Sequence, residues 1–231
     1  MTSAESIANI AYSLKAKWKK LTGLIFLRNK EITIISNNCI GGALYHDYKL
    51  QFNSPFINVN ISMEHYLQIC RNLQEYMQAE LQQVDVTEEI QDYFYRNLGN
   101  GKVTFPVGKL VLPTGEKVMI FFQHYETFAQ SKEAWNRRKE RIDYNNLFFV
   151  AATNVSGNER YCAEFACLPY PAARKLLLTV DIPLAGSGIH TRFMDVPKGV
   201  HFLTKIKGKS RCYYWCFPYL KWFWNPDTIK S

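Results

Sequence analysis

The stretch that decides the fold is "ITIISNNCIGGALYHDYKL", residues 32–50. It starts with a continuous apolar and β-branched run that ends at Ser36, which is typical of a strand covered on both faces of a sheet. Residues 41–50 can then form a short helix. A strand that leads through a polar turn into a helix is the repeating unit of α/β folds. We therefore expect an α/β sheet around this joint.

Strands and helices are predicted to alternate through the rest of the chain. Helices are expected at residues 63–82 behind the cap Ser62, after the cap Thr87, at 127–142 and at 157–167. Strands are expected in residues 102–112, 116–125, 146–153 and 174–181. The predicted fold is an α/β protein with a largely parallel or mixed open sheet flanked by helices. The hairpin of residues 103–122 is its mixed element.

The charge pattern divides the chain into three parts: a basic amphipathic segment at 1–30, an α/β domain at 31–200 and a basic aromatic tail at 201–231. The net charge of +8 is uneven, because residues 1–30 carry +5, residues 31–197 carry −3 and residues 198–231 carry +6. Nucleic-acid binders more often carry their positive charge on the folded body. Basic ends suit binding to an anionic membrane surface about as well as binding to a nucleic acid.

The N-terminal segment is predicted to be an amphipathic basic helix. Its apolar residues recur at helical intervals, and most of its lysines fall away from this stripe. The stripe consists of Ile7, Ile10, Leu14, Trp18 and Leu21. Two interpretations stand side by side: the helix docks on its own domain, or it makes a peripheral membrane contact.

The C-terminal stretch "RCYYWCFPYLKWFW", residues 211–224, holds eight aromatic residues. Three interpretations are open for it. The rings can pack over the core, lie at a membrane interface, or form a platform on which sugars or bases stack.

The sequence predicts a cytoplasmic protein, with a location at the inner face of the membrane as an extension of that prediction. No apolar run approaches the about 18 residues of a membrane span, and the first residues do not follow the pattern of a secretory signal. The six cysteines form no C-x-x-C pair. We expect reduced thiols, with neither zinc nor a disulfide framework.

The joint after the first strand is a candidate ligand site, because ligands of open α/β sheets bind beyond the carboxyl ends of the strands. Ser36, Asn37 and Asn38 offer uncharged polar groups there, and Gly41 and Gly42 would let a ligand approach the backbone. Helix N-terminal amides favour anions. The spacing matches neither G-x-G-x-x-G nor a Walker A loop. The alternative is that asparagine caps the helix and glycine relieves crowding.

A rigid loop at Asn53-Ser54-Pro55 follows, since proline keeps the preceding residue extended. His124 and Tyr125 then end another predicted strand. Histidine is the side chain best suited to acid–base work near neutral pH. The alternative is a structural histidine that bonds to the backbone.

The predicted helix after His124 carries Trp135, Arg138 and Arg141. Two arginines on one shoulder of a helix can hold a phosphate or a carboxylate. The alternative is a solvated face on which Glu133 and Glu140 pair with these arginines.

Several familiar catalytic patterns are missing from the sequence. There is no D-x-D triplet, so a divalent metal bridging a sugar-nucleotide diphosphate has no obvious pair of ligands. There is also no G-x-S-x-G elbow and no H-E-x-x-H. Neither a metal nor a cofactor is predicted.

Taken together, these segments resemble one family, the domain of unknown function 1919, often labelled exopolysaccharide-biosynthesis protein. The matching pieces are residues 33–56, "FPVGKL" at 105–110, residues 121–150 and "LPY" at 168–170. The resemblance implies a bacterial α/β protein encoded among surface-glycan or capsule genes. It supplies no demonstrated reaction.

The first hypothesis is an enzyme of exopolysaccharide or capsule assembly. It would be a metal-independent transferase with a sugar-nucleotide-like donor and a glycan or lipid-linked acceptor. His124 would be the base, and Arg138 with Arg141 would stabilise phosphate charge. The alternative is a non-catalytic glycan-binding or membrane-associated assembly module. Nucleic-acid binding ranks last.

Overall fold

The computed structural model describes residues 3–99, 101–153, 159–180, 188–194, 196 and 202–229. The helices are α1 (Ser3–Phe26), α2 (Ile40–Asp47), α3 (Met63–Arg71), α4 (Leu73–Gln78), α5 (Glu88–Asn97), α6 (Phe128–Lys139), α7 (Glu159–Ala166) and α8 (Tyr219–Trp224), with 3-10 turns at Ala172–Arg174 and Pro226–Thr228. The strands are β1 (Thr33–Ser36), β2 (Gln82–Val84), β3 (Val107–Val111), β4 (Lys117–Phe121), β5 (Leu147–Thr153), β6 (Lys175–Thr179) and β7 (His190–Phe193).

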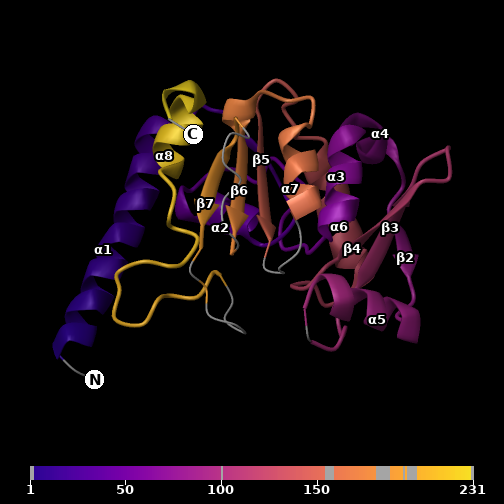
Figure 1. Cartoon of the computed structure of the whole chain (residues 1–231), viewed down its shortest axis with the longest axis horizontal. Helices are drawn as coiled ribbons and strands as arrows, with labels where there is room; N and C mark the ends of the chain where they lie inside the picture. The colour runs from indigo at the N-terminus through magenta and orange to yellow at the C-terminus, as the bar shows by residue number, and fades with distance from the viewer. Residues whose placement is uncertain are drawn as a thin grey trace.

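The predicted α/β class is confirmed. Four strands form a parallel sheet in the order β1-β5-β6-β7, and three form an antiparallel sheet in the order β2-β3-β4. Figure 1 shows the parallel sheet in the middle of the molecule, with α1 at one end and the antiparallel sheet at the other.

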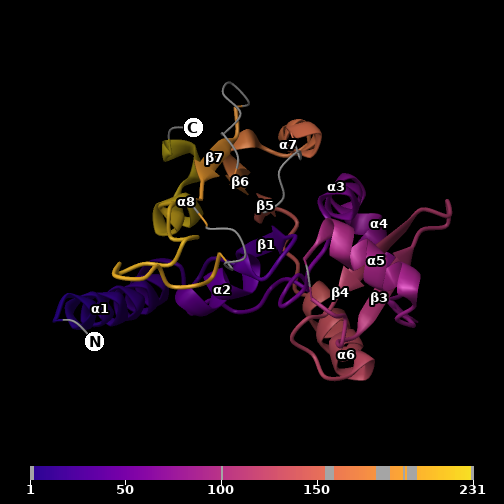
Figure 2. The same ribbon diagram turned by 60° about the horizontal axis from the view of Figure 1, so that its bottom comes forward.

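The hairpin of residues 103–122 forms as predicted, but it lies outside the parallel sheet. It pairs instead with β2, a strand that the sequence analysis placed at the end of a helix. That helix is shorter than predicted because it breaks at Asn72, whose φ is −125°. The chain is extended again at Ala79, so residues 82–84 are free to pair. Figure 2 shows the hairpin sheet with α5 and α6 beside it.

The strand at the opening joint is buried along its whole length, as its apolar run predicted. Every residue of β1 and β5 is buried. Alternate side chains of these strands point to opposite faces of the sheet and pack into two separate cores. Ile35 and Phe149 belong to a core shared with α3 and the hairpin sheet. Ile34 and Phe148 belong to a core shared with α2 and the C-terminal tail.

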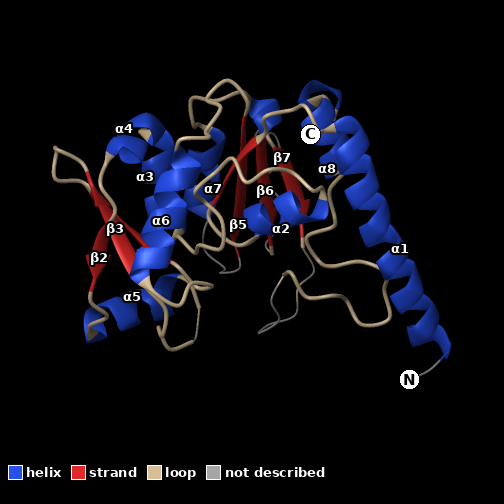
Figure 3. Cartoon of the chain, turned by 180° about the vertical axis from the view of Figure 1, so that it is seen from behind, coloured by secondary structure: helices blue, strands red, loops and turns tan. Residues whose placement is uncertain are grey.

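The aromatic tail packs into this second core, which is the first of its three interpretations. Tyr219, Trp222 and Phe223 are at most 2% exposed. Trp222 and Phe223 both meet Phe148 of β5 edge-on. Figure 3 shows α8 beside the upper part of α1, at the β7 end of the sheet. Lys198, just before the tail, and Lys230 within it lie outside the described residues.

The N-terminal helix docks on its own domain, but its apolar stripe does not face the domain. Ile7 and Trp18 are 67% and 65% exposed. The docked face holds Tyr12, which stacks on Trp215 of the tail, and Lys19, which pairs with Asp47. Across the described residues, no helix combines the length and the apolar character that crossing a membrane requires.

At Gly23, α1 lies very close to Tyr48, the C-cap residue of α2. A Cβ atom at this position would lie 1.9 Å from the carbonyl oxygen of Tyr48, which is a backbone atom and cannot swing aside. A glycine inside a helix normally costs stability relative to alanine. Its presence here is explained by this close approach.

We therefore expect Gly23→Ala to destabilise the protein by about 1–3 kcal/mol through overpacking. A helical glycine without such a contact would gain about 0.5–1 kcal/mol on the same substitution. The sign of the change in urea unfolding free energy decides between the two. Gly101→Ala is the control, because nothing lies within 4 Å of its added Cβ. A stabilising Gly23→Ala would show that α1 is not packed as described.

Candidate functional site

The candidate site is built outward from the carboxyl end of β1, where Asn37 follows the last strand residue. Its side-chain Nδ2 donates to the carbonyl of Ala152 at 3.0 Å, and its Oδ1 accepts from the Ala152 N–H at 2.9 Å. Its Oδ1 also accepts from Asn38, and its Nδ2 lies 3.5 Å from Met63 Sδ. These contacts use all the hydrogen-bond donors and acceptors of the Asn37 side-chain amide. A ligand could bind the Asn37 side chain only by displacing protein groups.

Asn38 and Ser36 shape the turn that starts α2. Asn38 Oδ1 accepts from the N–H of Ile40, the first residue of the helix, at 3.0 Å. Ser36 Oγ accepts from the N–H of Asn38. Both side chains are buried. The N-cap position itself is held by Cys39, which makes no side-chain cap hydrogen bond. Asn38 instead satisfies the first N–H of the helix from the residue before the cap, so its role is structural, close to the packing alternative.

The two glycines of α2 face the loop of residues 52–58 and not an open space. A Cβ at Gly41 would lie 2.9 Å from Ser36 Cβ and 3.4 Å from the carbonyl oxygen of Phe56. A Cβ at Gly42 would lie 3.2 Å from Asn58 Oδ1. The loop of residues 52–58 thus lies directly on α2 because neither glycine carries a side chain.

This loop links the joint to α6. Ser54 is buried, and its Oγ accepts from the N–H of Phe56, while Asn53 is 8% exposed. The Phe56 ring packs on Trp135 with ring centroids 5.4 Å apart. Trp135 itself is 1% exposed, and its indole N–H has no partner among the described residues. Trp135 is therefore a core residue beneath the loop.

Arg138, on the next turn of α6, is oriented entirely by uncharged groups. Its Nη1 donates to the hydroxyl of Tyr125 at 2.6 Å, and that hydroxyl in turn lies 3.4 Å from the carbonyl oxygen of Ile57. The guanidinium lies over the ring of Phe52, 5.2 Å from its centroid. In the described part of the chain, no carboxylate lies within 4 Å of Arg138. Its positive charge is thus held in place without a counter-charge.

The neighbouring Arg137 behaves differently, because it pairs with Glu133 at 3.0 Å on the solvated face of the helix. Glu133, one of the two acidic residues expected to neutralise Arg138 and Arg141, is therefore engaged elsewhere. Arg141 is exposed, and so is His124, which directly precedes Tyr125. Arg141 lies in the turn after α6, because the helix ends at Lys139 and not at residue 142 as predicted. Contacts to the loop of residues 52–58 are made by Tyr125 and Arg138.

The structure divides the predicted site residues into two groups joined by this loop. An inner group is buried among protein groups, and an outer, accessible group contains Arg138, its partner Tyr125 and two exposed residues near them in the sequence. The inner group is Ser36, Asn37, Asn38, Gly41, Gly42, Asn53, Ser54 and Trp135; the outer group is His124, Tyr125, Arg138 and Arg141. Only the outer group can reach a ligand without rearrangement.

Two buried threonines at the same sheet edge were not singled out from the sequence. Thr153 and Thr179 end β5 and β6, and their hydroxyl oxygens lie 3.3 Å apart. The signal was present, since each apolar run ends in a threonine where Asn37 follows β1. Within the described residues, no three His, Cys, Asp or Glu side chains gather as metal ligands would.

A second polar cluster lies where α3, α5 and β4 meet. The Tyr93 hydroxyl lies 2.7 Å from Ser62 Oγ and 3.0 Å from His65 Nδ1, and the N–H of Met119 donates to the same Nδ1. His65 is thus held as the neutral tautomer with its proton on Nε2. Burial, with a smaller effect of Lys117, lowers the pKa of His65 to about 4.

Comparison with known proteins supplies a family and a relative. The model of the family described as "Domain of unknown function (DUF1919)" matches residues 11–224. An uncharacterized protein of Haemophilus influenzae is 29% identical over 199 residues, which are 85% of this chain and 86% of the relative.

The pKa of His65 predicts how stability depends on pH. Because the folded-state pKa lies below the ordinary value of about 6.5, the unfolded chain binds the proton first as the pH falls. Stability is full above about pH 6.5 and is lost toward pH 4, by about 2 kcal/mol between pH 7.5 and pH 5. Urea unfolding at the two pH values measures this loss.

His65→Asn is the matched variant, because an amide oxygen can still accept from the Met119 N–H and does not titrate. His190 is also buried, and burial lowers its pKa, so wild type and variant share that contribution. The difference between their two pH dependences isolates His65. Identical pH dependences would contradict the assignment.

Proposed function

The chain belongs to the DUF1919 family, and on that premise we propose that it is a transferase of surface-glycan biosynthesis that acts in the cytoplasm. The donor is a phosphate-bearing molecule of the sugar-nucleotide kind, the acceptor is a glycan or lipid-linked glycan, and no metal ion takes part. The absence of a D-x-D triplet from the sequence supports the last point.

The observation that carries the proposal is the uncompensated guanidinium of Arg138. A phenol hydroxyl and an aromatic face orient it, and they leave most of its N–H donors unused. Arginine presents its donors in a planar fork that matches two phosphate oxygens. Arg137, one residue earlier, is instead paired with Glu133. Arg138 therefore suits a diphosphate better than a structural ion pair.

The other outer residues supply the remaining roles. Arg141 lies in the turn that follows α6, where its backbone N–H donates to the carbonyl of Arg138. In the proposal it joins Arg138 in stabilising a leaving phosphate. His124 is the proposed base, which accepts the proton of the acceptor hydroxyl as its oxygen attacks the sugar carbon. The bond from that carbon to the donor phosphate breaks, and the phosphate leaves with the bonding electrons.

The buried group acts through the loop of residues 52–58. Phe52 at one end of this loop supports Arg138, and Ile57 at the other end contacts Tyr125. Gly41 and Gly42 allow the loop to lie on α2. These inner residues are positioning residues in the proposal, with no direct contact to the ligand.

The alternative, a non-catalytic glycan-binding or assembly module, gave the main roles to the aromatic tail and the N-terminal helix. Most rings of the tail are buried, including Tyr214, Phe217 and Tyr219. Stacking of a sugar on them would require opening the second core. Glycan binding without any effect of a sugar nucleotide would nevertheless favour this alternative.

Arg138→Gln should weaken donor binding while Arg137→Gln should not. A thermal-shift screen with uridine-, guanosine- and cytidine-linked sugars first identifies the stabilising donor, and titration calorimetry then gives its Kd. Loss of a charged hydrogen-bond donor should raise the Kd about tenfold or more. Arg137→Gln should stay within about twofold because that arginine faces Glu133. Equal effects of the two variants, or no stabilising donor, would contradict the proposed site.

His124→Ala should lower kcat about a hundredfold or more, as loss of a general base does, with the donor Kd unchanged. The measurement is transfer of the identified sugar to acceptor glycan, followed by mass spectrometry across a range of pH. The matched control is His46→Ala, which removes another exposed histidine, on α2. Full activity of His124→Ala would remove His124 from the mechanism and leave the binding site intact.

A further inference from the structure

The outward face of α1 is the largest run of exposed apolar side chains in the described part of the chain. The residues of this α1 stripe are Ile7, Ile10, Leu14, Trp18, Leu21 and Ile25, and each is between 48% and 67% exposed. Contiguous apolar surface of this kind marks an interaction site. Figure 1 shows α1 along the outer end of the molecule, with only one side against the rest of the chain.

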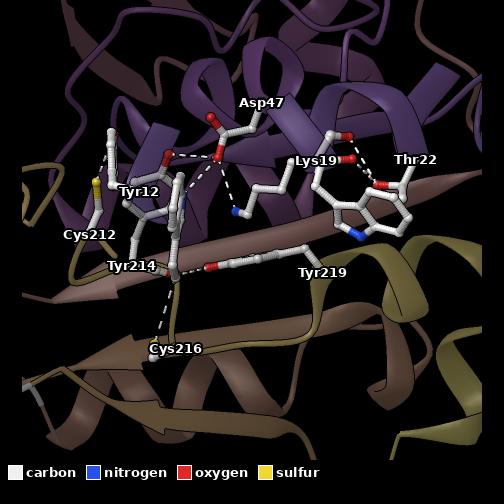
Figure 4. A network of polar contacts seen from close by, with 10 residues as sticks. Tyr12, Lys19, Thr22, Asp47, Cys212, Tyr214, Cys216 and Tyr219 are labelled. Carbon is white, nitrogen blue, oxygen red and sulfur yellow. Dashed lines mark hydrogen bonds and ion pairs between the residues drawn. The ribbon is translucent and has the colours of Figure 1, made fainter. Parts of the chain in front are cut away.

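The outward orientation is enforced by polar contacts on the opposite face of the helix. Figure 4 shows Lys19 and Tyr214 converging on the carboxylate of Asp47, at 3.1 and 2.9 Å. Tyr12 stacks on Trp215, which also donates to Asp47. Turning the stripe inward would break all of these contacts. The apolar face is therefore presented to whatever binds it.

The spacing of the stripe favours a flat surface over a partner helix. Its members follow one another by 3, 4, 4, 3 and 4 residues, so 18 residues make about five turns of 3.6 residues. A stripe with this period runs straight along the helix. A heptad seam, with about 3.5 residues per turn, drifts and makes two helices supercoil. The stripe lacks that drift.

Positive charge borders the stripe. Lys17 lies three residues after Leu14 and four before Leu21, so it is on the edge of the stripe, and Lys20 lies three residues further along. Within the described residues, neither lysine has a carboxylate within 4 Å. Both cations are therefore free to meet anions outside the protein.

A second exposed group of aromatic and basic side chains lies at the C-terminal end of α1. Trp224 is 52% exposed and meets Phe26 edge-on, with ring centroids 5.9 Å apart. The ammonium group of Lys30 lies 4.6 Å from the Trp224 ring centroid. Tryptophan and lysine together are typical of the interface between lipid and water. The two basic ends of the chain thus meet on one surface.

We propose that the α1 stripe binds an anionic lipid bilayer, with α1 lying in the plane of the headgroups. The apolar side chains enter the boundary between headgroups and acyl chains, while Lys17 and Lys20 meet anionic headgroups. This inference rests on α1 and the contacts that orient it, and it does not depend on the proposed transferase activity.

The test is sedimentation of the full chain with phosphatidylcholine vesicles that contain or lack phosphatidylglycerol, at low and high salt. Wild type should bind the anionic vesicles about tenfold more tightly or better, and salt should reduce this difference. The double variant Leu14→Ser/Trp18→Ser should weaken binding about tenfold or more. Its control is Tyr95→Ser, which removes an apolar side chain that is 59% exposed on α5.

A charge variant separates the two contributions. Lys17→Glu/Lys20→Glu should weaken binding to anionic vesicles about fivefold per lysine and leave binding to neutral vesicles unchanged, whereas Lys102→Glu should change neither. Circular dichroism checks that each variant keeps its fold. Absence of vesicle binding, or equal binding by wild type and Leu14→Ser/Trp18→Ser, overturns the proposal. Light scattering that shows a wild-type dimer and a Leu14→Ser/Trp18→Ser monomer assigns the stripe to self-association instead and equally overturns it.

Discussion

The carboxylate of Asp47 joins α1 and α2 to the C-terminal tail. It accepts from Lys19 of α1 and from Tyr214 and Trp215 of the tail, at distances of 2.8–3.1 Å. A largely buried carboxylate is tolerated only when such donors replace water. Burial lowers the pKa of Lys19, and Asp47 acts in the opposite direction. Removing Asp47 would leave Lys19 buried without its partner. The docked position of α1 therefore depends on the Asp47 carboxylate.

A second constraint shapes the candidate site. The loop of residues 52–58 meets the helix glycines on one side and α6 on the other. Polar residues that looked like ligands are bound inside the protein: Asn37 to the backbone of Ala152 in β5, and Ser54 to the N–H of Phe56 within the loop. The same loop orients Arg138 through Phe52. Buried amides and an accessible arginine are thus parts of one arrangement, the first providing rigidity and the second a free positive charge.

Local patterns predicted the elements well, because capping and periodicity are properties of neighbouring residues. Ser62 and Thr87 cap their helices as expected. The failures concern pairing between distant segments. β2 was missed because three residues carry almost no periodic signal, and their partner β3 lies more than twenty residues later. The hairpin was assigned to the parallel sheet because nothing in its own pattern says which strand lies next to it.

The sequence by itself determined the order of strands and helices, the amphipathic character of α1 and the family. It also showed that arginines and a histidine follow the hairpin. Only the tertiary structure decided which face of α1 is covered, because that choice depends on Asp47 and on tail residues about 200 positions away from Tyr12. It likewise decided that Arg137 is paired while Arg138 is not. Adjacent side chains on a helix point about 100° apart, and only the packed chain shows what each of them meets.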